Sequence, residues 1–178
     1  ESFPVINLTE TVRKVSEFYR PVIEDGGRRL DMHDLEPCMV KGNGALLFQM
    51  LSNLLENSII HTPKGTTITI ALSGAQGEAA IMVCDDGPGI PAQERDKVLQ
   101  RFYRRDVSRT SPGHGLGLSL VTAIATAHGG SVVIRDPLCG TSGVEFVIIM
   151  PLQHPENQKP DAQETAPGSL TARLAHAD

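Results

Sequence analysis

The stretch from residue 43 to residue 84 places the tightest constraint on the fold. Leucine and methionine side chains recur at helical spacing from about Asn43 to His61. Apolar and polar residues alternate in Thr66–Ser73, and Glu78–Cys84 is mostly apolar, which is typical of strands in a sheet covered on one face. This part of the chain therefore predicts a helix packed against one face of a sheet.

The remaining elements extend the same two layers. We expect helices at Leu8–Glu24, Ala92–Gln100 and Leu116–Ala127, and strands at Arg29–His33, Cys38–Lys41, Ser131–Arg135 and Val144–Met150. The order does not fit a βαβ dinucleotide-binding domain. It predicts an α/β (α+β) two-layer sandwich in which a mixed sheet of about five strands packs on about three helices. We expect the domain to span residues 1–151, with a mobile lid at about 90–113 and a disordered tail at 152–178.

Composition narrows the class of protein. The 178 residues are 40% hydrophobic and only 4% aromatic, which suits one domain with an aliphatic core. The net charge of −5 argues against nucleic-acid binding. From Glu94 to Arg109, however, six basic residues accompany three acidic ones. This local excess of positive charge suits a small polyanionic ligand.

Cysteine usage and hydropathy bear on the compartment. Three scattered cysteines with no CxxC pair indicate neither a zinc site nor a disulfide framework, so a reducing compartment is the simpler interpretation. No apolar run reaches the roughly 18 residues of a membrane span, and we expect no membrane contact by this chain.

Four short segments, in one order along the chain, carry the candidate chemistry. They are Asn53-Leu54-Leu55-Glu56-Asn57, Asp85-Asp86-Gly87-Pro88-Gly89, Arg101-Phe102-Tyr103-Arg104 and Gly113-His114-Gly115-Leu116-Gly117-Leu118.

In the first segment, two asparagines lie four residues apart on the predicted helix and therefore share one face. The amide oxygen of Asn57 could bind Mg²⁺, which prefers oxygen ligands, and Asn53 could hold a metal-bound water or a phosphate oxygen. The alternative is a pair of side chains that merely hydrogen-bond at the helix surface.

In the second segment, Asp85 comes at the end of an apolar strand. A carboxylate there can accept a hydrogen bond from the exocyclic amine of a base, and Gly87 and Gly89 allow backbone to approach a flat ring. A plain Asp-Gly turn is the alternative. A calcium loop is less suitable, because glycine stands where oxygen-bearing side chains are needed.

The glycines of the fourth segment precede a predicted helix. Their backbone N–H groups and the helix N-terminus could cradle phosphates. The spacing is neither GxGxxG nor GxxxxGK[ST], so it predicts neither a Rossmann domain nor a P-loop. A flexible hinge is the alternative.

The third segment lies in the polar stretch. Phe102 could close over a nucleotide while Arg104 meets its terminal phosphate. A solvated basic patch with Phe102 in the core is the alternative. The four segments occurring together in this order favour a Mg²⁺-nucleotide pocket over the separate alternatives.

The segments resemble the N, G1, F and G2 boxes of the catalytic and ATP-binding domain of bacterial sensor histidine kinases, within the GHKL ATPase superfamily. The resemblance runs from about Leu8 to Pro151. It implies that Asn57 binds Mg²⁺, that Asn53 and Arg104 are catalytic, and that Asp85 reads adenine. The nucleotide contacts that it implies are Asn53, Asn57, His61, Asp85, Gly87, Gly89, Ile90, Phe102, Arg104, Gly113, His114, Gly115, Leu116, Gly117 and Leu118.

The sequence departs from the family pattern at three positions. Ile60 stands where Lys or Arg often reaches the phosphates, which could weaken ATP binding. Pro112 replaces a frequent Gly, and Ser58 replaces a common Ala, a change that we expect to be harmless.

Family kinases phosphorylate a histidine on a separate dimerising helical hairpin. His33-Asp34-Leu35-Glu36-Pro37 only superficially echoes the usual acceptor motif, because it is short and strand-like. The resemblance thus implies a cytoplasmic, monomeric ATP-binding half of a kinase whose parent could be anchored in the inner membrane. Its partners would be ATP, the phosphoacceptor hairpin and a response regulator.

Two alternatives come from the same superfamily. One is a nucleotide-sensing pseudokinase, suggested by Ile60, and the other is a serine kinase of the anti-sigma type. Gyrase-like and chaperone-like ATPases are less suitable, because they carry Glu at the position of Asn53.

Overall fold

The computed structural model describes residues 3–100, 117–138 and 142–153. Along the chain the elements are β1 (Val5–Asn7), α1 (Leu8–Asp25), β2 (Arg29–Leu35), β3 (Met39–Lys41), α2 (Gly44–His61), β4 (Thr67–Ala75), β5 (Glu78–Asp85), a 3₁₀ turn (Ala92–Glu94), α3 (Arg95–Val98), α4 (Gly117–Ala127), β6 (Ser131–Arg135) and β7 (Val144–Pro151).

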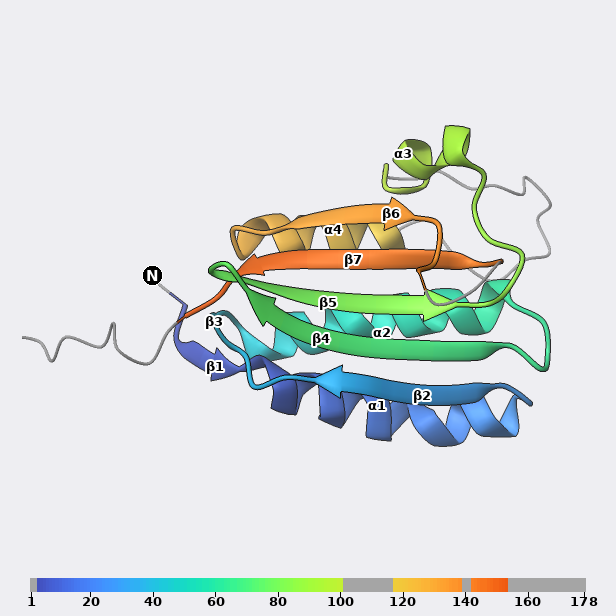
Figure 1. Ribbon diagram of the computed structural model, residues 1–178, viewed down its shortest axis with the longest axis horizontal. Helices are drawn as coiled ribbons and strands as arrows, with labels where there is room; N and C mark the ends of the chain where they lie inside the picture. Colours follow the sequence, from blue (N-terminus) through green and yellow to red (C-terminus); the bar gives the residue numbers. More distant parts are fainter. Residues whose placement is uncertain (1–2, 101–116, 139–141, 154–178) are drawn as a thin grey trace, which may run out of the picture.

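The fold has two layers, as the sequence predicts (Figure 1). A five-stranded sheet in the order β2-β4-β5-β7-β6 forms one layer, and α1, α2 and α4 lie behind it in the other. The sheet is mixed, because β2 runs parallel to β4 whereas the other neighbours are antiparallel. The core between the layers is mostly aliphatic.

Three local features differ from the sequence expectation. The short strand β1 was not expected, and it pairs with β3 in a separate two-stranded sheet. The helix expected at Ala92–Gln100 is instead a 3₁₀ turn followed by the four-residue α3. The strand expected at Arg29–His33 continues to Leu35 through a bulge, where Asp34 has a φ of 45°.

Side-chain caps fix where the two long helices begin. Asn7 accepts a hydrogen bond from the N–H of Glu10 at the start of α1. Asn43 accepts from the N–H groups of Ala45 and Leu46 at the start of α2. These bonds satisfy donors that the first turn of a helix otherwise leaves without partners.

The strand β5 and the helix α2 run in the same direction and end at the same edge of the molecule, on the right in Figure 1. This places Asp85, the last residue of β5, beside the last turns of α2. None of the helices in the described part of the chain combines the length and apolar composition that crossing a bilayer requires.

Candidate functional site

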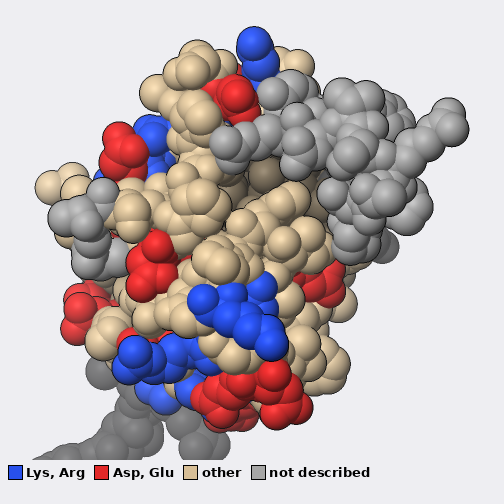
Figure 2. Space-filling view, turned by 90° about the vertical axis from the view of Figure 1, so that its right-hand side faces the viewer, with Lys and Arg blue, Asp and Glu red and all other residues tan. Residues whose placement is uncertain are grey.

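The predicted site residues that the structure describes lie toward this edge, around α2, the end of β5, the loop that leaves β5 and the start of α4. Figure 2 views the edge directly: uncharged residues make up much of its middle, and charged side chains lie mostly around them.

Asp85 is the buried acidic side chain of the site, with only 3% of its surface exposed. Its Oδ2 accepts a hydrogen bond from the hydroxyl of Ser58 at 3.0 Å, and its Oδ1 accepts one from the N–H of Gly87 at 3.2 Å. Burial raises the pKa of the carboxyl, while these two hydrogen bonds act in the opposite direction. A carboxylate has more acceptor sites than these bonds use, so Asp85 can still accept a hydrogen bond from a ligand.

Ser58 belongs to the site, although the sequence analysis expected it to be a harmless replacement. It is 1% exposed and holds one oxygen of Asp85. A signal was present in the sequence, since Ser58 lies four residues after the buried Leu54 on the apolar face of α2. A buried polar group on such a face needs a hydrogen-bond partner, so a serine there predicts a polar contact inside the protein.

Asn53 and Asn57 lie four residues apart on α2, as predicted, and both are half-buried. The amide nitrogen of Asn53 is buried and has no hydrogen-bond partner within the described residues. Leaving such a donor unsatisfied costs free energy that a bound acceptor, such as a phosphate oxygen, would recover. The amide of Asn53 is thus suited to an anionic ligand that arrives at this face of the helix.

Mg²⁺ also fits the donor set of α2. Asn57 offers an amide oxygen, and Mg²⁺ is commonly held by one or two protein oxygens together with phosphates and waters. Within the described ranges, no three His, Cys, Asp or Glu side chains are grouped as a metal site. Any metal held by these residues would therefore depend on the phosphates of the nucleotide for further ligands.

Close backbone packing shapes the loop after β5. Gly89 has a φ of 74°, and a Cβ there would lie 2.4 Å from the carbonyl oxygen of Gly143. Gly143 has a φ of 109°, and its Cβ would lie 1.7 Å from the carbonyl oxygen of Asp85. A Cβ on Gly87 would meet the side chain of Thr62 at 2.7 Å. The glycines therefore allow the loop to pack tightly against its neighbours.

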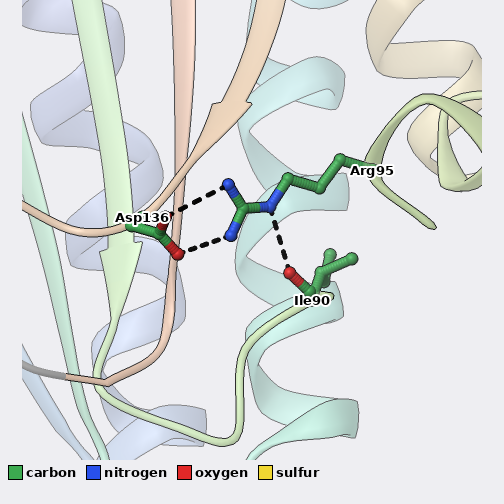
Figure 3. A network of polar contacts seen from close by, with 3 residues as sticks. All are labelled: Ile90, Arg95 and Asp136. Carbon is green, nitrogen blue, oxygen red and sulfur yellow. Dashed lines mark hydrogen bonds and ion pairs between the residues drawn. The ribbon is translucent and has the colours of Figure 1, made fainter. Parts of the chain in front are cut away.

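The other predicted contacts on described residues surround this centre. Ile90 is half-buried, and its carbonyl oxygen accepts a hydrogen bond from Nε of Arg95 at 3.0 Å (Figure 3). His61 is exposed at the end of α2, and Ile60 beside it is 44% exposed. Gly117 and Leu118 form the start of α4.

Six further predicted contacts lie outside the described residues: Phe102, Arg104, Gly113, His114, Gly115 and Leu116. His33, the residue of the superficial acceptor motif, is exposed on the edge strand β2 and not on a long helix.

Comparison with known protein families shows which family this chain belongs to. Residues 42–154 match the model of the histidine kinase-, DNA gyrase B- and HSP90-like ATPases, which is more than half of the chain. The chain belongs to this ATPase family. The family resemblance stated from the four segments is therefore confirmed.

Named relatives of this ATPase domain are sensor kinases. The probable sensor histidine kinase TcrY of Mycobacterium tuberculosis is 38% identical over 119 residues, which cover 66% of this chain and 24% of that protein. The chain thus spans about a quarter of the length of this curated relative.

Solved structures confirm the fold. The mycobacterial sensor histidine kinase MprB superimposes with a TM-score of 0.71 at 29% identity, covering 85% of this chain and 98% of that one. The catalytic domain of histidine kinase ThkA gives a TM-score of 0.72 at 25% identity, covering 85% and 96%. The chain is a histidine kinase-type ATPase domain, and ATP is the nucleotide that such a domain implies.

Proposed function

We propose that this domain binds Mg²⁺-ATP and donates the γ-phosphoryl group to a histidine on a separate dimerisation and phosphoacceptor domain of a two-component sensor kinase. The observation that carries the proposal is the buried Asp85 carboxylate, held by Ser58 and Gly87, together with the buried amide nitrogen of Asn53, which has no partner among the described residues. One group suits an exocyclic amine and the other suits a phosphate oxygen.

Asp85 would select adenine. As an ionised carboxylate it only accepts hydrogen bonds, so it favours an amine over a carbonyl at the edge of the base. Because the group is buried, a base that leaves it without a donor loses affinity through the cost of desolvation. Gly87 and Gly89 would lie beneath the ring, with Ile90 as a further contact, and His61 would lie near the ribose or phosphates.

Asn57 and Asn53 would organise the phosphates. Asn57 would hold Mg²⁺ through its amide oxygen, and when bound this ion neutralises charge on the phosphates. Asn53 would bond a phosphate oxygen or a metal-bound water, and the start of α4 would face the phosphates with its N–H groups. Arg104, together with Phe102 and residues Gly113 to Leu116, is proposed here only from the family pattern.

In the transfer step, an imidazole nitrogen of the acceptor histidine would form a bond to the γ-phosphorus while the bond to the β-phosphate oxygen breaks and ADP leaves. The domain contributes positioning and charge neutralisation. We further propose that the isolated domain is a monomer, that it works in the cytoplasm, and that a response regulator receives the phosphoryl group afterwards.

Two measurements test the proposal in sequence. Calorimetric titration with a non-hydrolysable ATP analogue, with and without Mg²⁺, is expected to show Mg²⁺-dependent binding. The chain is then mixed with the helical hairpin of its own kinase and γ-labelled ATP, and acid-labile phosphohistidine is expected on the hairpin.

Each other outcome indicates a different function. Binding without transfer would support a nucleotide-sensing pseudokinase, and label on a serine of a partner would support the anti-sigma type of kinase. No binding of the analogue in either condition would contradict the proposal.

A further inference from the structure

Arg95, which the sequence analysis counted only as part of a basic stretch, joins three segments of the chain. It is the first residue of α3, and its side chain is 16% exposed. Its Nε donates to the carbonyl oxygen of Ile90 at 3.0 Å, and its two terminal nitrogens face the carboxylate oxygens of Asp136 at 2.5 and 3.5 Å. Figure 3 shows the guanidinium group between these two partners.

The three segments differ in their relation to the site. Ile90 lies near the end of the loop that leaves Asp85, and Asp136 directly follows β6 at the start of the β6–β7 connection. The far end of the same connection also holds this loop, because the hydroxyl of Ser142 donates to the carbonyl oxygen of Asp86 at 3.2 Å. The base-side loop, residues 86–91, is therefore attached to the β6–β7 connection twice. Ser142 holds the start of the loop directly, and Arg95 links the end of the loop to Asp136.

The two attachments act on a chain segment with few remaining degrees of freedom. Pro88 and Pro91 have φ angles fixed by their rings, and the N–H groups of Asp86 and Gly87 are already hydrogen-bonded, so much of the loop's remaining freedom lies at Gly89 and Ile90. The bond from Arg95 fixes the peptide unit of Ile90. An arginine suits this position well, because its planar group bonds a carbonyl on one side and a carboxylate on another at the same time.

We propose that Arg95 is a positioning residue for nucleotide recognition, which holds residues 86–90 in the conformation that binds the base by linking Ile90 to Asp136. The inference depends on the proposed function, since it assigns a task within the same site. Asp136 is 85% exposed, so this ion pair contributes little to overall stability. The expected effect of this ion pair is instead to keep the base-side loop ordered.

The chain offers a matched control in Arg20. Its Nη1 donates to the carbonyl oxygen of Leu30 at 3.0 Å and to the carboxylate of Glu24 at 3.2 Å. Arg20 thus makes the same two kinds of contact, but it joins α1 to β2, whereas the base-side loop leaves β5. Arg20→Ala removes the contacts without touching this loop.

Calorimetric titration of the whole chain with the non-hydrolysable ATP analogue and Mg²⁺ tests the proposal. Arg95→Ala is expected to lower affinity about tenfold, the factor for one lost hydrogen bond to a charged donor. Arg95→Lys is expected to recover only part of this loss, because an ammonium group lacks the fork. Asp136→Asn is expected to have a smaller effect, and Arg20→Ala none.

Amide hydrogen exchange supplies a readout that general destabilisation would not produce. In the chain without nucleotide, Arg95→Ala is expected to accelerate exchange at Asp86, Gly87, Gly89 and Ile90, while β4 and β5 keep their protection. Arg20→Ala should leave this loop unchanged. If Arg95→Ala does not fold, Arg95→Lys and Asp136→Asn are read in the same two assays.

Two results would overturn this inference without affecting the proposed function. One is wild-type affinity and wild-type loop exchange in Arg95→Ala, Arg95→Lys and Asp136→Asn. The other is an equal loss of affinity in Arg95→Ala and Arg20→Ala. If the wild-type chain itself bound no nucleotide, the proposed function would fail first, and the inference would fail with it.

Discussion

The two ends of α2 differ in how their polar groups are satisfied. At its beginning, Asn43 caps the helix through its side chain, and its own N–H donates to Nε2 of His128 at 3.0 Å. The ring proton of His128 therefore lies on Nδ1, which donates to the carbonyl oxygen of Ile124 at 2.7 Å. Every one of these groups has a partner inside the protein.

The second half of α2 has the opposite arrangement. The amide nitrogen of Asn53 is buried without a partner among the described residues, and the Asp85 carboxyl beside Ser58 is buried with a raised pKa. Buried polar groups that the fold leaves unsatisfied or strains electrostatically tend to mark functional sites. We propose that this contrast separates residues that stabilise the fold from residues that bind a ligand.

The largest effect is expected at the end of α2 that we propose binds the nucleotide. Asn57→Ala should reduce affinity for the ATP analogue in Mg²⁺ about 100-fold, or about 2.8 kcal/mol, because the amide oxygen proposed for the metal is lost. The affinity without Mg²⁺ should not change, and neither should the unfolding temperature. Calorimetry in both conditions measures this. An equal loss with and without Mg²⁺ would contradict the assignment of Asn57.

Asp85→Asn should weaken ATP binding by about 2 kcal/mol, as for a lost hydrogen bond in which one partner is charged. The same change should stabilise the fold at pH 7. Burial raises the pKa of this carboxyl, so its ionisation opposes folding. The extra stability that the protonated carboxyl provides is fully present below the ordinary pKa of an aspartate. It is lost as the pH rises through the raised pKa of this carboxyl in the folded protein.

Thermal unfolding from acidic to neutral pH checks this second part. Wild type should lose stability relative to Asp85→Asn as the pH rises through that range. Unchanged ATP affinity would show that the base pocket is assigned wrongly, whereas a pH-independent difference in unfolding temperature would contradict the burial argument only.

At the other end of the helix, Asn43→Ala should cost about 1 kcal/mol of unfolding free energy, the usual effect of removing an N-cap side chain. Because the polar groups there are all engaged in the fold, affinity for the ATP analogue should stay at the wild-type value. Urea unfolding and calorimetry on the same sample measure both. A loss of affinity comparable to that of Asp85→Asn would remove the distinction between the two ends.

The smallest effect is expected at Ile60, which is 44% exposed. Ile60→Lys should tighten binding of the ATP analogue about threefold, because an exposed cation near phosphates contributes only a few tenths of a kcal/mol to 1 kcal/mol. The gain should disappear at high salt. Ile60→Gln is the uncharged control and should bind as wild type does.

Sequence patterns predicted the parts of this molecule that depend on local periodicity. The helices α1 and α2 and the strands β4 to β7 appear within one or two residues of their expected bounds. The position of Asp85 at a strand end was also predicted correctly, because it depends only on where an apolar run stops.

Features that depend on pairing between distant segments were not predictable in this way. The three-residue strand β1 exists only because β3 pairs with it. The bond between Ser58 and Asp85 spans 27 positions, and the contact of Arg95 with Asp136 spans 41. A basic residue in a basic stretch gives no local sign that its charge is already paired.

The close approach of Gly143 to Asp85 limits how this site can evolve. With a Cβ 1.7 Å from the carbonyl oxygen of Asp85 and a φ of 109°, position 143 should accept glycine alone in a saturation library. Gly89, packed on the same turn, should be nearly as restricted. Changes in base preference would then have to come from the α2 side, at Ser58 and its neighbours. In a selection for altered nucleotide use, the substitutions recovered should therefore lie on the α2 side of the proposed pocket. The glycines on the opposite side should remain unchanged.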